Sequence, residues 1–132
     1  MTPKTPDGSG RILAAVEDLL FRSRIQKTAE ALGLQAEFPR RREALLEALR
    51  NAPPDLLILD LESRRFRPLE LLREAEDALA GVEVVGFVPH VRGDLVRAAR
   101  KAGCGRVMAR GAFAGELPAI LSGAAPGGDR GT

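Results

Sequence analysis

Short apolar runs alternate with longer amphipathic segments along this chain. The runs are five to seven residues long and are bounded by glycine, proline or charged residues, which is typical of buried strands. Between them, apolar residues recur three and four positions apart, which is typical of helices with one buried face. The predicted strands are residues 12–16, 34–38, 55–61, 82–88 and 105–109, and the predicted helices are residues 18–32, 41–51, 69–80, 93–102 and 113–121.

Glycine and proline residues mark the boundaries of the predicted elements. Gly33 follows the first helix, at a position where a left-handed capping residue is favoured. Pro53 and Pro54 stop the second helix before the third strand begins. Pro68 opens the third helix as a first-turn proline, and Gly81 closes it.

The strict alternation of strands and helices predicts a parallel sheet with helices on both faces. We therefore expect an α/β protein with a flavodoxin-like, three-layer α/β/α sandwich, whose five-stranded parallel sheet has the order 2-1-3-4-5. In this order the functional crevice lies between strands 1 and 3, at their C-terminal ends. We expect one domain over residues 11–123, a flexible leader over residues 1–10 and a disordered tail over residues 124–132.

Composition narrows the class of protein. No apolar run approaches the ~18–20 residues that a membrane span requires, and the N-terminus has no apolar core of a signal peptide. Cys104 is the single cysteine, which excludes an intramolecular disulfide and fits a reducing cytoplasm. We expect a cytoplasmic protein without a membrane partner.

The charge pattern argues against a nucleic-acid partner. The net charge is only +2, basic and acidic residues are interspersed, and the chain has neither tryptophan nor tyrosine to stack on bases. Two arginine clusters stand out, at residues 40–42 and 64–67. A solvated surface is the favoured interpretation of these clusters, and binding of phosphate or an acidic partner is the alternative.

Asp60 ends the apolar run of the third predicted strand. A carboxylate at the C-terminal end of a central parallel strand lies where open α/β sheets bind ligands. The chain has no glycine-rich phosphate loop after the first strand, which argues against a dinucleotide or flavin site. The sequence therefore directs attention to Asp60 itself.

Four phrases resemble the receiver domain of response regulators, the CheY-like family. They are RILAAVEDLLFR (residues 11–22), PDLLILDL (54–61), PLELLR (68–73) and AGCGRVMAR (102–110). The resemblance covers roughly residues 11–123 and is carried by the order and separation of the phrases. It implies the fold given above, and it implies that Asp60 matches the aspartate that receivers phosphorylate.

The resemblance also shows which receiver groups are replaced. The acidic pair that binds Mg²⁺ matches Val16 and Glu17, with Asp18 next, so the metal candidates are Glu17 and Asp60, and Asp18 if the register shifts by one residue. The switching Thr or Ser matches Val88, which cannot bond a phosphoryl oxygen. The phosphate-pairing lysine and the aromatic switch residue are replaced as well, by Arg110 and Val107.

These replacements favour a static pocket over a phosphate switch. We expect Arg110 to form a partly buried ion pair with Asp60 and Glu17, because a buried carboxylate needs a fixed partner. Binding of Mg²⁺ is weakened and not excluded, and no other cofactor is expected. His90 lies just past the fourth strand at the rim of the pocket, where an exposed loop residue is favoured over a functional one.

A candidate protein interface lies on the last helix–strand–helix block. In receivers this face carries dimer or partner contacts, and here its mixed charge around an apolar centre suits a modest interface. The residues assigned to it are Arg92, Arg97, Val107, Phe113 and Leu117. A homodimer through this block is one expectation for the partner, and a histidine kinase or a downstream signalling protein is the other.

The predicted function is that of a stand-alone pseudo-receiver. It would act as a protein–protein interaction module in bacterial-type signal transduction, with weak or no phospho-switching, and it would not be an enzyme. The first alternative is an active, atypical response regulator that is phosphorylated on Asp60 in a two-component phosphorelay. The second alternative is a small-molecule sensor that uses the crevice at the strand ends.

Overall fold

The computed structural model describes residues 10–124. The predicted leader and tail lie outside this range except for their inner residues, Gly10 and Ala124, which are buried. The strands are β1 (Arg11–Ala15), β2 (Gln35–Glu37), β3 (Leu56–Asp60), β4 (Glu83–Val88) and β5 (Arg106–Ala109). The helices are α1 (Leu19–Ala31), α2 (Arg42–Asn51), α3 (Pro68–Glu74), η1 (Glu76–Leu79, a 3₁₀ turn), α4 (Gly93–Ala102), α5 (Arg110–Gly115) and α6 (Leu117–Ser122).

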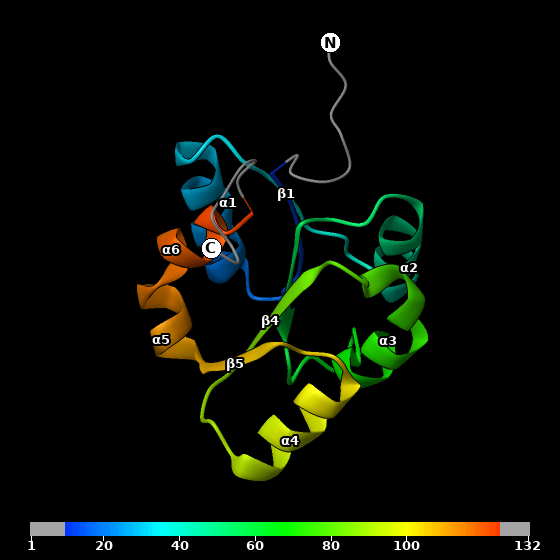
Figure 1. Ribbon diagram of the computed structural model, residues 1–132. Helices are drawn as coiled ribbons and strands as arrows, with labels where there is room; N and C mark the ends of the chain where they lie inside the picture. The colour runs from blue at the N-terminus through cyan, green and yellow to red at the C-terminus, as the bar shows by residue number, and fades with distance from the viewer. Residues whose placement is uncertain (1–9, 125–132) are drawn as a thin grey trace.

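The sheet has five parallel strands in the order β2-β1-β3-β4-β5, as predicted (Figure 1). Ala15 of β1 pairs with Leu59 of β3, so the residues that follow them, Val16 and Asp60, emerge at the same edge. On the other side of β3, Asp60 pairs with Phe87 of β4. The C-terminal ends of β1, β3 and β4 therefore surround the place where Asp60 leaves the sheet.

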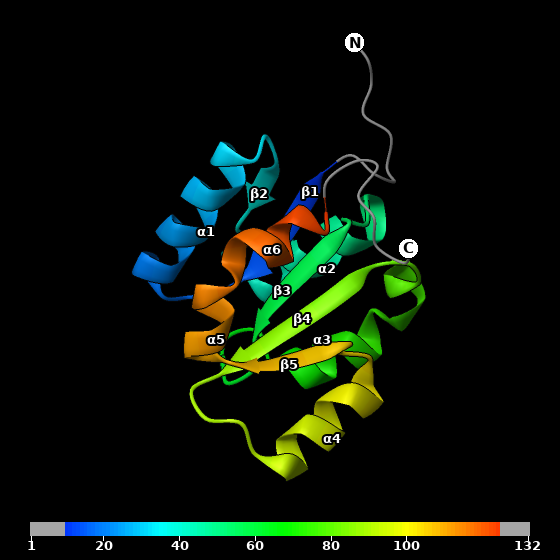
Figure 2. The ribbon, with the colours of Figure 1, turned by 60° about the vertical axis from the view of Figure 1, so that its left-hand side comes forward.

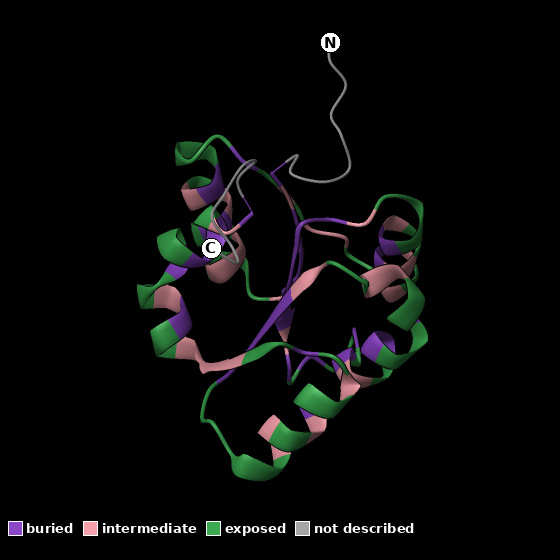
Figure 3. Cartoon of the chain, in the orientation of Figure 1, coloured by how far each residue is buried: buried purple, intermediate pink, exposed green. Residues whose placement is uncertain are grey.

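Helices cover both faces of the sheet and create two cores (Figures 1 and 2). Because successive strand residues point to opposite faces, Ile12 and Ala14 enter the core beneath α1, α5 and α6, whereas Leu13 and Ala15 enter the core beneath α2, α3 and α4. The central strands β1, β3 and β4 are mostly buried, whereas the edge strands β2 and β5 and the outer helix surfaces are partly or fully exposed (Figure 3). Within residues 10–124, none of the helices has the length and apolar character needed to cross a membrane.

Two predicted helices differ from those observed. The segment predicted as one helix over residues 113–121 forms α5 and α6, because Pro118 lacks an N–H and starts a new helix at its first turn. The segment predicted over residues 69–80 ends as an α-helix at Glu74 and continues as the tighter turn η1, a frequent ending of α-helices.

Asp55 joins the start of β3 to the start of β1. Its Oδ2 accepts hydrogen bonds from the backbone N–H groups of Gly10, at 2.9 Å, and Arg11, at 3.0 Å. The Asp55 side chain is buried, so these bonds satisfy donors that have little access to water. This arrangement fixes the N-terminal edge of the sheet at the end opposite Asp60.

Candidate functional site: a crevice of carboxylates held by the protein

Asp60 is half-buried at the C-terminal end of β3. Its Oδ1 accepts a hydrogen bond from the backbone N–H of Glu62 at 3.0 Å. Burial raises the pKa of Asp60 above its ordinary value, and the Glu62 hydrogen bond and the charge of Arg110 oppose this shift. The negative charges of Glu17 and Glu62 add to the increase. The Asp60 carboxylate is therefore partly removed from water, and the Glu62 hydrogen bond and the charge of Arg110 offset only part of the cost of its burial.

Glu17 turns toward the connection between β3 and α3. Its Oε2 accepts a hydrogen bond of 2.5 Å from the hydroxyl of Ser63, and its Oε1 lies 3.8 Å from Nε of Arg65. Ser63 is itself buried and its Oγ also accepts from the backbone N–H of Phe66. The Ser63 hydroxyl and the Arg65 guanidinium, both in the β3–α3 connection, therefore orient the Glu17 carboxylate.

Asp18 closes the N-terminus of α1. Its Oδ1 accepts the backbone N–H of Phe21 at 3.0 Å, which is an N-cap hydrogen bond. Its Oδ2 lies 3.1 Å from Nη2 of Arg110. The Phe21 hydrogen bond lowers the pKa of Asp18, and the charge of Arg110 lowers it further. Asp18 therefore caps α1 and forms an ion pair with Arg110.

The guanidinium of Arg110 contacts α1, although its charge also acts on Asp60. Besides its ion pair with Asp18, its guanidinium lies 5.1 Å from the centre of the Phe21 ring, which packs on Phe87 and Phe113. The predicted ion pair of Arg110 with Asp60 and Glu17 is wrong: within residues 10–124 neither carboxylate forms an ion pair with it. A planar guanidinium favours an aromatic face and a capping carboxylate, and here both are on α1.

The other predicted pocket residues do not supply polar groups to the crevice. Val16 is 4% exposed and Val88 is fully buried, and they belong to the cores on opposite faces of the sheet. Val107, which was assigned to the interface and not to the pocket, is partly buried against the core beneath α4. His90 is exposed in the connection after β4. The structure therefore places these residues near the edge of the sheet without assembling them into a polar site.

The receiver fold suggests a divalent cation beside the aspartate, and the residues of this chain do not fit one. Mg²⁺ is held by carboxylates and waters in near-octahedral geometry. Here Glu17 is bonded to Ser63, Asp18 caps a helix, and Val16 places an apolar side chain between the strand ends. In the part of the chain that the structure describes, no three carboxylate, histidine or cysteine side chains form a group that could hold a metal ion.

The predicted interface needs a correction. Phe113 and Leu117 are 0% and 2% exposed. Apolar residues four positions apart face the same side of a helical segment, and here that side packs against the sheet. They cannot form the centre of an exposed surface. Arg92 and Arg97 are exposed on and before α4, as an interface would require. Whether they bind a partner stays a prediction.

Sequence reasoning missed two features of this region. Ser63 donates a hydrogen bond to Glu17, which lies 46 positions away in the sequence, and no local sequence pattern predicts such a contact. Leu19 and Leu20 are 71% and 83% exposed at the start of α1, beside Asp18. Asp18 directly before an apolar helical pattern did carry a signal, that of an N-cap residue.

Comparisons with known proteins place the fold. No family model and no curated protein matches the chain. A response regulator from Hahella chejuensis is 21% identical with a TM-score of 0.76, over 85% of this chain and 92% of that one. A CheY-like receiver domain protein from Methanospirillum hungatei JF-1 is 18% identical with a TM-score of 0.71, over 81% of this chain and 86% of that one.

A third similar structure shows a modified site. It is a response regulator from Burkholderia pseudomallei with a phosphorylated aspartic acid, a calcium ion and citrate, 16% identical with a TM-score of 0.72. The match covers 84% of this chain, which spans 65% of the Burkholderia chain. These likenesses confirm the predicted fold: the chain has the fold of response-regulator receiver domains.

Proposed function

We propose that this protein is a pseudo-receiver, a protein–protein interaction module of two-component-type signalling with little or no phospho-switching. One observation carries the proposal: Glu17 and Asp18, two of the three carboxylates at the strand ends, are already bonded to side chains or backbone of the protein itself. Within residues 10–124, the Asp60 carboxylate accepts one hydrogen bond, from the backbone N–H of Glu62. A receiver needs such carboxylates for a cation and a phosphoryl group.

The groups that would respond to a phosphoryl group are also missing. Transfer to an aspartate depends on neutralising the charge of the phosphoryl oxygens. Val88 offers no hydroxyl, and the guanidinium of Arg110 is engaged by Asp18 and the Phe21 ring. A phosphoryl group on Asp60 would therefore meet neither a hydrogen-bond donor from β4 nor a free cation from the end of β5.

Protein binding gains support from exposed apolar side chains near the crevice. Leu19 and Leu20 are adjacent, and both leave most of their surface in water. Such surface is costly to expose and gains free energy when a partner covers it. We infer that the start of α1 contributes to the partner surface, together with the exposed arginines Arg92 and Arg97 near α4.

The test separates protein binding from phosphorylation. Affinity capture from the source cells is run with the natural chain, with Asp60→Ala and with the double variant Leu19→Ser/Leu20→Ser. Leu32→Ser, at a 40% exposed leucine at the other end of α1, is the matched control. The proposal expects the same partner with the natural chain, Asp60→Ala and Leu32→Ser, and its loss with the double variant.

Acetyl phosphate with Mg²⁺ provides the second arm. Intact-mass measurement should show no stable phosphoryl group on the natural chain. A partner that binds only after this treatment, and never to Asp60→Ala, would show instead that the protein is an active response regulator.

A further inference from the structure

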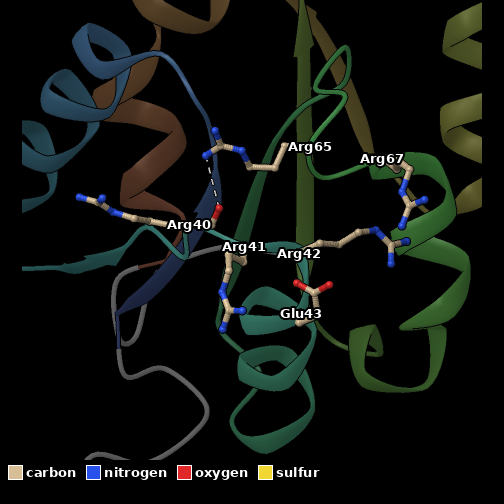
Figure 4. Close-up of a pocket in the computed structure, with 6 residues that line it drawn as sticks. All are labelled: Arg40, Arg41, Arg42, Glu43, Arg65 and Arg67. Atoms are coloured by element: carbon tan, nitrogen blue, oxygen red, sulfur yellow. Dashed lines mark hydrogen bonds between the residues drawn. The ribbon is translucent and has the colours of Figure 1, made fainter.

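The two arginine clusters of the sequence come together at one hollow (Figure 4). The first cluster comprises the last two residues of the β2–α2 connection and the first residue of α2, and the second lies between β3 and α3. The hollow has a volume of about 430 Å³, within the range of small-ligand pockets. Its lining residues are Arg40, Arg41, Arg42, Glu43, Arg65 and Arg67.

Arg42 builds the wall of this hollow. Its guanidinium donates to both carboxylate oxygens of Glu74, at 3.1 and 3.0 Å, and to the backbone carbonyl of Phe66 at 3.0 Å. The Arg42 side chain is only 11% exposed. These bonds fix the start of α2 against the β3–α3 connection, so the hollow is held open by the fold and does not depend on a ligand.

The remaining arginines keep donors available. Within residues 10–124, Arg40 and Arg41 form no ion pair. Arg65 and Arg67 each approach one carboxylate, of Glu17 and Glu70, at 3.8 Å, and both pairs are exposed to solvent. Arg65 also donates one hydrogen bond to the backbone carbonyl of Arg40 at 3.4 Å (Figure 4). Exposed pairs at this distance contribute little, and each guanidinium has five N–H donors.

The start of α2 adds to the positive potential. Arg41 is the N-cap residue and its side chain caps no backbone N–H, so the first-turn N–H groups of this ten-residue helix face the same region. Glu43 is the one acidic residue of the lining and offsets part of the charge. The lining holds five guanidiniums and Glu43, and three of the guanidiniums approach a further carboxylate, of Glu74, Glu17 or Glu70, which leaves an excess of about one positive charge.

The lining selects for phosphoryl groups and against bases or apolar rings. All its residues are charged. The nearest aromatic groups are not free to stack, because Phe66 is 1% exposed and the ring of Phe38 is covered by the guanidinium of Arg22 at 5.6 Å. Guanidiniums bind phosphoryl oxygens with paired hydrogen bonds, and their distribution over two connections suits more than one phosphoryl group.

We propose that this hollow binds linked phosphoryl groups, a diphosphate or triphosphate, either as an inorganic anion or as the phosphate chain of a nucleotide. Arg65 links this hollow to Glu17 of the candidate site, but the proposed binding does not need Asp60 and does not depend on the function proposed above. Linked phosphates carry oxygens on adjacent centres, so one anion can accept hydrogen bonds from guanidiniums of both connections at once.

The test is calorimetric titration of the full chain at ~0.15 M salt, where screening limits non-specific attraction. The probes are orthophosphate, pyrophosphate, tripolyphosphate, ATP and a single-stranded oligonucleotide. Arg40→Gln/Arg41→Gln removes two guanidiniums that have no protein ion pair. Arg100→Gln/Lys101→Gln removes two exposed basic residues of α4 and is the control with the same change of charge.

Tripolyphosphate should saturate one site and bind at least about tenfold more tightly than orthophosphate. The Arg40/Arg41 variant should lose about tenfold or more of this affinity, and the α4 control about twofold or less. Arg67→Gln, on the other connection, should weaken binding as well. Equal affinity for ATP and tripolyphosphate would identify the phosphate chain as the whole determinant, and tighter ATP binding would identify a nucleotide.

Three results would overturn the proposal. Equal losses in the Arg40/Arg41 variant and the α4 control would show a general effect of net charge. Orthophosphate binding as tightly as tripolyphosphate would show an adventitious ion only. An oligonucleotide that binds more tightly than every phosphate chain, and displaces it, would show a nucleic-acid surface.

Discussion

Ser63→Ala should destabilise the fold, because one buried hydroxyl makes two hydrogen bonds at the site. Ser63 Oγ donates to Oε2 of Glu17 at 2.5 Å and accepts from the backbone N–H of Phe66 at 3.1 Å. Alanine leaves the Phe66 donor buried without its acceptor, at a cost of about 1–3 kcal/mol. The bond to Glu17 is charge-assisted, but Glu17 is 36% exposed, which limits its loss to about 1 kcal/mol.

The expected decrease in the free energy of unfolding is therefore about 2–4 kcal/mol, measured by urea denaturation at neutral pH. Ser122→Ala is the matched control. Ser122 Oγ donates to the carbonyl of Pro118 at 2.7 Å from an exposed position of α6, so its removal should change stability by less than about 0.5 kcal/mol.

A double-mutant cycle with Glu17→Gln isolates the contact itself. The coupling between Ser63 and Glu17 should be about 1 kcal/mol, because the two side chains bond each other directly. Equal stabilities of Ser63→Ala and Ser122→Ala, or a coupling of zero, would refute the view that Ser63 holds Glu17 in place.

Variants at three further positions test other parts of the structure. Asp60→Asn should be more stable than the natural chain at neutral pH, because burial raises the pKa of Asp60. A carboxyl group whose pKa is raised in the folded state stabilises the fold below about pH 3.8, and this contribution is lost as the pH rises through the pKa of the folded state. The free energy of unfolding, measured by urea denaturation from pH 3 to 7, should therefore depend less on pH in the variant. Gly86→Ala places a Cβ 2.7 Å from Cγ of the buried Leu61, and chemical denaturation should show a loss of about 1–3 kcal/mol; an unchanged midpoint would mean that Leu61 moves freely. Asp55→Ala removes the acceptor of two backbone N–H groups and should cost about 2–4 kcal/mol, whereas Asp55→Asn should cost less, and a calorimetric Tm series in which the two variants agree would contradict this.

The central strands could be predicted to within a residue because their apolar runs have few alternatives. β3 was expected over residues 55–61 and spans Leu56–Asp60, and its position between β1 and β4 follows from crossover rules. The last helix was less accurate, although Pro118 signalled its interruption. Phe113 and Leu117 were assigned to a surface by resemblance, while their own spacing indicated a buried face.

The candidate site was harder to predict because its contacts join distant positions. The residue types of Glu17, Asp60 and Arg110 and their place at one sheet edge were evident. The partner of Arg110 depends on the orientation of its side chain and on a contact with Asp18 across 92 positions. Likewise, the two arginine clusters are 24 positions apart, from Arg41 to Arg65, and share a hollow only because the strand order brings their connections together.

The measurement that tests the central claim most directly is an amide NMR titration with Mg²⁺ and beryllium fluoride, which mimics a phosphoryl group on aspartate. A pocket whose carboxylates are already held by Ser63, Phe21 and Arg110 should leave the spectrum of the natural chain unchanged. Large shifts at Asp60, Val88 and Arg110 that disappear in Asp60→Asn would contradict the account and identify an active phosphate switch.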